Sequence, residues 1–261
     1  MIRSALSSAA LSGSDIQTVL AAAVSSGVQG IEWTGDDYLA PGDSTRAKEA
    51  MYATLRAGLC TASYVMPGRA SLGDRAAFNL ALLTARELNA PVLRLRPALR
   101  GGLPSADAET FAVTARTLGD EAGEHGITLC FSMDADSVLD SCQRAAELLA
   151  QIGHPFVKLA WEPAGANFDD AMEAIASLAG RVGLIIVRPD DLDGAGEADG
   201  DRSEEWLQYL DALEEQNGSP DMTRHVVFRT MPDRVERLSS AVAAIKSWSA
   251  TLRRYHQRRV Y

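Results

Sequence analysis

The chain has 261 residues, of which 46% are hydrophobic and 23% charged, a composition close to the average for soluble globular proteins. No stretch approaches the roughly 20 apolar residues that cross a bilayer, which excludes a membrane-spanning helix. A formal net charge of −10 argues against general nucleic-acid binding, because neutralising phosphates needs a basic face. Three cysteines in a chain of this length, and an N-terminus too weak for a signal peptide, predict a cytoplasmic location.

Short apolar or β-branched runs alternate with helical patterns along the whole chain. The predicted strands are Ile2–Ser7, Gly30–Trp33, Leu59–Tyr64, Val92–Arg96, Thr128–Ser132, Val157–Glu162, Gly183–Arg188 and His225–Thr230. One strand per about 33 residues is the spacing of a repeated strand–helix unit. Eight such units predict an α/β fold, a single-domain (β/α)8 TIM barrel over residues 1–261. A doubly wound open sheet is the alternative, disfavoured because no Gly-x-Gly-x-x-Gly motif follows a strand.

Polar side chains gather near the predicted C-terminal ends of the strands, the end at which TIM barrels carry their chemistry and which we call the mouth. Alternation along each strand predicts which of them face the barrel axis. The predicted set is Glu32, Arg94, Arg96, Ser132, Glu162, Arg188 and Arg229. Four guanidiniums against two carboxylates make a cationic mouth that suits a small anionic ligand, such as a sugar phosphate or sugar acid. The alternative is that arginines and glutamates neutralise each other in a packed mouth.

The chain resembles the xylose isomerase-like TIM barrel superfamily of sugar phosphate isomerases and epimerases. The segments that carry the resemblance include AAAVSSGVQGIEW, ALLTARELNAPVLRL, DEAGEHGITLCFSMD and LLAQIGHPFVKLAWEPAGAN. The resemblance extends over the whole chain in pattern. It implies a sugar isomerase or epimerase, in which inward carboxylates and a histidine on strands 5 to 8 hold one divalent metal.

Carried over residue by residue, that metal site is mostly missing. The strand-5 position falls on Ser132, and the strand-6 position falls on Glu162, which keeps a carboxylate. The strand-7 histidine falls on Ile186, or on Val187 if the register differs by one, and the strand-8 glutamate falls on Arg229. The resemblance thus implies a degenerate metal site, in which Arg229 could supply the positive charge of the metal.

The histidine positions agree with this reading without reference to the resemblance. The four histidines, none at the C-terminal end of a predicted strand, are His125, His154, His225 and His256. A site of oxygen ligands alone would need several carboxylates, and only Glu162, with Glu32 and Asp134, could contribute. We therefore expect no cofactor, the alternative being one divalent cation (Mg, Mn or Zn) at Glu162.

Three functions stay open from the sequence. In the first, the protein is an isomerase/epimerase-like enzyme, and Glu162, with Glu32 as second choice, would move a proton α to a carbonyl. Arg188 and Arg229 would stabilise the enediolate oxygen or hold an anionic tail. In the second, a catalytically inactive barrel binds a small anionic sugar-like molecule. In the third, the protein has an assembly role. We expect no nucleic-acid or membrane partner, and a homo-oligomer is possible.

The net charge belongs to one segment. Residues 190–215 contain eleven acidic side chains and a single basic one, Arg202, while acids and bases balance in the rest of the chain. This segment follows the seventh predicted strand, next to the mouth. It could act as an acidic flap that gates the mouth or competes with an anionic ligand.

Overall fold

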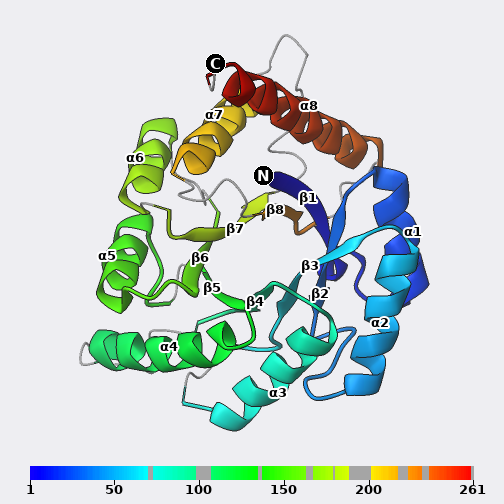
Figure 1. Ribbon diagram of the computed structural model, residues 1–261, viewed down its shortest axis with the longest axis vertical. Helices are drawn as coiled ribbons and strands as arrows, with labels where there is room; N and C mark the ends of the chain where they lie inside the picture. The colour runs from blue at the N-terminus through cyan, green and yellow to red at the C-terminus, as the bar shows by residue number, and fades with distance from the viewer. Residues whose placement is uncertain are drawn as a thin grey trace.

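The computed structural model describes residues 1–69, 73–97, 107–134, 137–162, 167–178, 180–187, 201–216, 223–230 and 235–259. Eight parallel strands close into a barrel in chain order, each paired with its neighbours, and the last paired with the first (Figure 1). They are β1 (Ile2–Ser7), β2 (Gly30–Thr34), β3 (Cys60–Val65), β4 (Val92–Leu95), β5 (Thr128–Ser132), β6 (Val157–Trp161), β7 (Val182–Val187) and β8 (Arg224–Phe228). The predicted (β/α)8 TIM barrel is confirmed.

The helices form an outer ring around the strands, as Figure 1 shows. They are α1 (Ile16–Ser26), α2 (Ser44–Arg56), α3 (Arg75–Glu87), α4 (Asp107–Gly123), α5 (Cys142–Ile152), α6 (Phe168–Leu178), α7 (Asp201–Glu215) and α8 (Val235–Arg259), with a short 3-10 helix, η1 (Ser8–Leu11), after β1. Within the described residues, no helix combines the length and the apolar character needed to span a membrane.

All eight predicted strands exist, and their bounds differ from the prediction by at most two residues. β4 ends at Leu95 and β6 at Trp161, so Arg96 and Glu162 are the first residues after their strands. β8 ends at Phe228, which places Arg229 in the same position relative to its strand. Arg96, Glu162 and Arg229 therefore begin the loops of the mouth, whereas Ser132 is the last residue of β5.

The two faces of each strand separate as the alternation predicts. Leu93, Leu95 and Trp161 pack with the helices in the large outer core, because every second side chain of a strand points away from the barrel axis. The barrel interior holds a separate cluster of smaller apolar side chains, Ala5, Ala62, Val92, Cys130, Ala160, Leu184, Ile186 and Val227. This apolar layer fills the middle of the barrel and separates its two ends.

Two register shifts change which residues meet inside the barrel. Between β2 and β3, Ile31 pairs with Thr61 but Glu32 pairs with Ser63, so Ala62 is an extra residue. Between β6 and β7 the extra residue is Gly183. A Cβ at position 183 would lie 2.6 Å from the Sγ of buried Cys130, so glycine is required there by close packing.

The acidic segment divides into two parts. Residues 201–215 form α7 in the outer ring (Figure 1), while residues 190–200 lie outside the described residues. On α7, Asp211 accepts a hydrogen bond from Trp248 Nε1 at 2.6 Å, and Glu214 accepts one from the N-terminal amine at 3.0 Å. These two acidic side chains therefore contact α8 and the N-terminus. Gating of the mouth by the rest of the segment stays a prediction.

Candidate functional site at the mouth

A buried ion pair forms the floor of the mouth. Arg94 Nη2 donates to Glu32 Oε1 at 2.7 Å, and Arg94 Nε donates to Glu32 Oε2 at 2.9 Å, the bidentate geometry that guanidinium and carboxylate favour. Ser63 Oγ, brought inward by the shift in β3, donates to Glu32 Oε2 at 2.7 Å. Arg94 Nη1 donates to Ser132 Oγ at 3.2 Å. The side chain of Glu32 is 0% exposed and that of Arg94 6%, so the charges compensate each other out of water.

A second layer of ion pairs lies on the loops above. Arg96 Nη2 donates to Asp36 Oδ2 at 2.5 Å, and Arg96 Nε donates to the carbonyl of Gly68 at 3.1 Å. Arg69 Nη1 lies 2.8 Å from Asp134 Oδ2. The loops that follow β2, β3, β4 and β5 are therefore joined by arginine contacts. Because these side chains are roughly 20–45% exposed, water screens these pairs far more than the buried one.

The third arrangement joins β6 to β8. Arg229 Nη1 lies 3.4 Å from Glu162 Oε2, and Arg229 Nη2 lies 3.4 Å from Glu162 Oε1. The Glu162 side chain is 16% exposed and that of Arg229 41%, so both can contact a molecule in the mouth. Here a carboxylate and a guanidinium meet solvent side by side, which the buried pair of Glu32 and Arg94 does not allow.

The predicted site residues thus fall into separate groups. Glu32, Arg94 and Ser132 form one connected cluster, Glu162 and Arg229 a second, and Arg96 pairs elsewhere. Arg188 lies outside the described residues. The set of mouth residues predicted from the sequence did not include Asp36, Arg69 or Ser63. It also did not give Asp134 an arginine partner. With them, four described arginines face four carboxylates. For the described residues, the ion-pairing alternative is therefore a better description than an excess of positive charge.

The described residues at the expected metal-ligand positions make other contacts. Ile186 points into the apolar interior of the barrel and is 2% exposed, which settles that it, and not Val187, faces inward. Ser132 accepts its hydrogen bond from Arg94, and Glu162 faces a guanidinium. Among the described residues no three His, Cys, Asp or Glu side chains come together as a metal site would require.

A closed barrel of eight parallel strands with polar side chains at the strand ends is the architecture of TIM-barrel proteins. Comparison with known proteins shows which of them have a similar fold. No protein-family model matches the chain, and no curated protein matches its sequence. An L-ribulose 3-epimerase structure matches with a TM-score of 0.73 at 18% identity, covering 98% of this chain and 97% of that one. A xylose isomerase-like TIM barrel protein from Mycobacterium smegmatis, in complex with magnesium, matches at 0.73 and 14%, covering 96% and 97%.

A third structure, the probable 3-DHS dehydratase AsbF of Bacillus anthracis, matches with a TM-score of 0.68 at 11% identity, covering 94% of this chain and 98% of that one. These identities are low, so what the matches show is the fold. This chain has the fold of the xylose isomerase-like TIM barrels, as its sequence pattern predicts. Since one of these structures is described as an epimerase and another as a probable dehydratase, fold likeness alone does not select a reaction or a substrate.

Proposed function

We propose that this protein is an isomerase/epimerase-like enzyme acting on a small anionic sugar derivative at the mouth, without a divalent metal. The observation that carries the proposal is the pair of Glu162 and Arg229, a carboxylate and a guanidinium side by side and within reach of a ligand. The likeness of the fold to an L-ribulose 3-epimerase supports the reaction class. The cytoplasmic location and a homo-oligomer stay predictions.

Glu162 would move the proton. Removing a proton α to a carbonyl needs a base close to that carbon, and it creates negative charge on the carbonyl oxygen. Arg229, permanently charged, would stabilise that oxygen in the transition state, where a metal would otherwise act. A proton transfer by Glu32 would first require breaking its two contacts with Arg94. We therefore place the transfer on Glu162 and give the cluster of Glu32, Arg94 and Ser132 the role of shaping the floor.

The experiment follows the proton rather than a chosen product. Ketoses, their phosphates and sugar acids are incubated with the protein in D2O with a chelator, and deuterium at the carbon next to the carbonyl is followed by NMR. We expect exchange that persists with chelator and falls roughly 10²–10⁴-fold in Glu162→Gln. Glu49→Gln, an exposed carboxylate on α2, is the matched control and should exchange as wild type does. Exchange that requires added metal would overturn the metal-free mechanism and favour a divalent cation at Glu162.

The second candidate is a catalytically inactive barrel that binds a small anion or serves in assembly. The observation that favours it is the pairing of every described mouth carboxylate named above with an arginine. In that case no substrate of the panel exchanges, while an anion still raises the melting temperature through Arg229. Sedimentation of the unliganded protein would test the assembly role independently of any ligand.

A further inference from the structure

A pocket opens at the end of the barrel opposite to the mouth. Its volume is about 550 Å³, within the range of roughly 300–1,000 Å³ that small-molecule sites occupy. Its wall comes from the beginnings of strands: Cys60 starts β3, His225 is the second residue of β8, and Pro91 and Ile127 directly precede β4 and β5. The middle layer of apolar side chains lies between this pocket and Glu162. The pocket is thus separate from the site proposed above.

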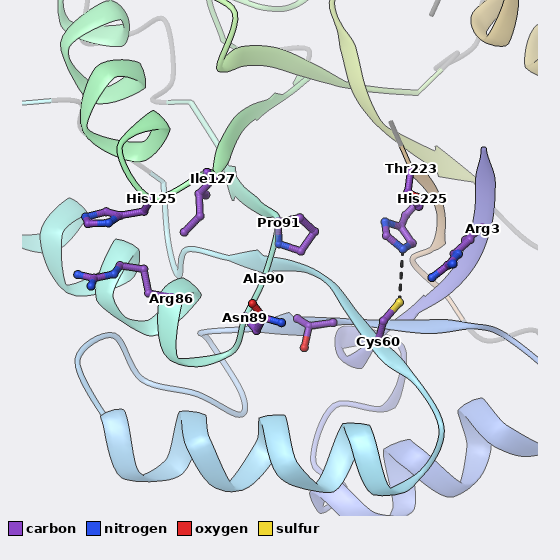
Figure 2. Close-up of a pocket in the computed structure, with 12 residues that line it drawn as sticks. Arg3, Cys60, Arg86, Asn89, Ala90, Pro91, His125, Ile127, Thr223 and His225 are labelled. Atoms are coloured by element: carbon purple, nitrogen blue, oxygen red, sulfur yellow. Dashed lines mark hydrogen bonds between the residues drawn. The ribbon is translucent and has the colours of Figure 1, made fainter. Parts of the chain in front are cut away.

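Two arginines give this pocket its character. Arg3 reaches it from β1 inside the barrel and is partly buried, while Arg86 is exposed on the last turn of α3. Figure 2 shows them on opposite sides, with Asn89, Ala90 and Pro91 between them. The described wall contains no aspartate or glutamate, and the described part of the chain forms no ion pair with either arginine. An arginine without a counter-ion in a concave site is ready for an anionic group.

The inner end of the pocket carries the positive charge of Arg3 beside a buried imidazole. His225 Nε2 lies 3.6 Å from Cys60 Sγ (Figure 2), and His225 is 4% exposed. Burial, with a smaller contribution from the positive charge of neighbouring Arg3, lowers the pKa of His225 to about 4. The imidazole is therefore uncharged at neutral pH, and the positive charge of Arg3 is not compensated there. A bound anion would relieve this positive potential.

The rest of the wall limits the kind of anion. Apart from the imidazoles of His125 and His225, the described wall has no aromatic ring on which a nucleobase could stack. Polar groups come from Asn89 and Thr223, and apolar surface from Pro91 and Ile127. Two arginines at opposite sides of the pocket match two anionic groups carried by one molecule.

We propose that this pocket binds a dianion, by which we mean a small non-aromatic organic molecule with two anionic groups, one at Arg3 and the other at Arg86. The anionic groups are carboxylates or phosphates, because guanidinium recognises both in the same bidentate way. Binding at this end would couple to the barrel through β1 and β8, which carry Arg3 and His225. The site does not depend on the isomerase proposal, since no residue is shared with the mouth.

Binding is measured by calorimetry on the full-length protein at fixed ionic strength. The probes are succinate, fructose 1,6-bisphosphate and inorganic phosphate, with acetate as the monoanion and fructose as the neutral control. We expect one of the dianions to bind at least tenfold more tightly than acetate, and fructose not to bind. A preference for succinate or for the bisphosphate identifies the anionic group. Equal binding of acetate and the dianions would overturn the proposal.

Variants then locate the binding. Arg86→Gln should weaken dianion binding roughly tenfold or more, because a charge-assisted contact is lost. Arg56→Gln is the matched control, since Arg56 occupies the last turn of α2 as Arg86 does that of α3 and is not part of the wall. Arg3→Gln should have at least the effect of Arg86→Gln. Binding lost in Arg229→Gln but kept in Arg86→Gln would place the dianion at the mouth and overturn the proposal.

Cys60 supplies a readout that needs no variant of the arginines. Its thiol lies in the wall, whereas Cys142 lies half-buried on α5 and serves as the internal reference. Cys130 is fully buried, so the reagent does not reach it, whereas Cys142 is partly exposed. We expect saturating dianion to slow iodoacetamide labelling of Cys60 severalfold and to leave Cys142 unchanged. Unchanged labelling of Cys60 at saturation would contradict binding in this pocket.

Discussion

At the mouth, four described arginines each lie beside a carboxylate, whereas at the opposite end Arg3 and Arg86 line a pocket whose described wall contains no acid. The difference follows from the segments that carry the side chains at each end, which are loops at the mouth and short turns at the opposite end. Loops after the strands are long enough to bring acids such as Asp36 and Asp134 back over the barrel, while short turns such as Asn89 to Pro91 form the other end. The described arginines of the mouth therefore each have a carboxylate partner, whereas the described residues give neither Arg3 nor Arg86 one.

Breaking the buried pair of Arg94 with Glu32 should have the largest effect. Arg94→Met leaves the buried carboxylate of Glu32 with Ser63 as its one donor among the described residues. We expect urea unfolding to show a loss of about 3–5 kcal/mol in the free energy of unfolding. The double variant Glu32→Gln with Arg94→Met removes the charge and should recover much of that loss. A single variant as stable as the double would show that the pair is not a compensated buried charge.

At the other end, His225 should make stability depend on pH. Its folded pKa of about 4 lies below the ordinary value of 6.5. Between these two pH values the imidazole is protonated in the unfolded chain and not in the folded chain. The contribution is complete above about pH 6.5 and is lost as the pH falls toward 4, by roughly 3 kcal/mol. Urea unfolding is measured across this pH range for wild type and for His225→Gln. The carboxylates titrate alike in the two proteins, so their contribution cancels in the difference. The variant should show the smaller dependence, and identical curves would contradict the buried, uncharged imidazole.

The layer between the two ends should tolerate no added volume. Gly183→Ala places a Cβ 2.6 Å from Cys130 Sγ, and we expect a cost of about 1–3 kcal/mol in the free energy of unfolding. Adding Cys130→Ala removes the sulfur and should restore part of the stability. If the second change instead adds its own loss in full, the two positions are not in contact.

The exposed ion pair of Arg96 with Asp36 should contribute least to the free energy of unfolding. Asp36→Asn removes the partner of Arg96, but with both side chains about 40% exposed the loss in urea unfolding should stay within about 1 kcal/mol. The small effect beside that of Arg94→Met would confirm that burial, not the number of pairs, sets the contribution. A loss as large as that of Arg94→Met would remove this distinction.

Much of the fold could be predicted because its signals are local. Apolar runs, their alternation and the turns between them placed all eight strands and turned Glu32, Arg94 and Ser132 toward the axis. Ser63 could not be found in this way, because the extra residue Ala62 reverses the alternation after it. Asp36 could not be paired with Arg96 either, since 60 residues separate them and both lie beyond their strands.

The sequence by itself therefore determined the barrel, the inward positions of Glu32, Arg94 and Ser132, and the place of Glu162 at the end of β6. Only the tertiary structure decided the charge balance of the mouth, because each ion pair there joins different strands or loops. The same is true of the pocket at the other end. Arg3 and His225 lie far apart in the chain and meet only because β8 pairs with β1 when the barrel closes.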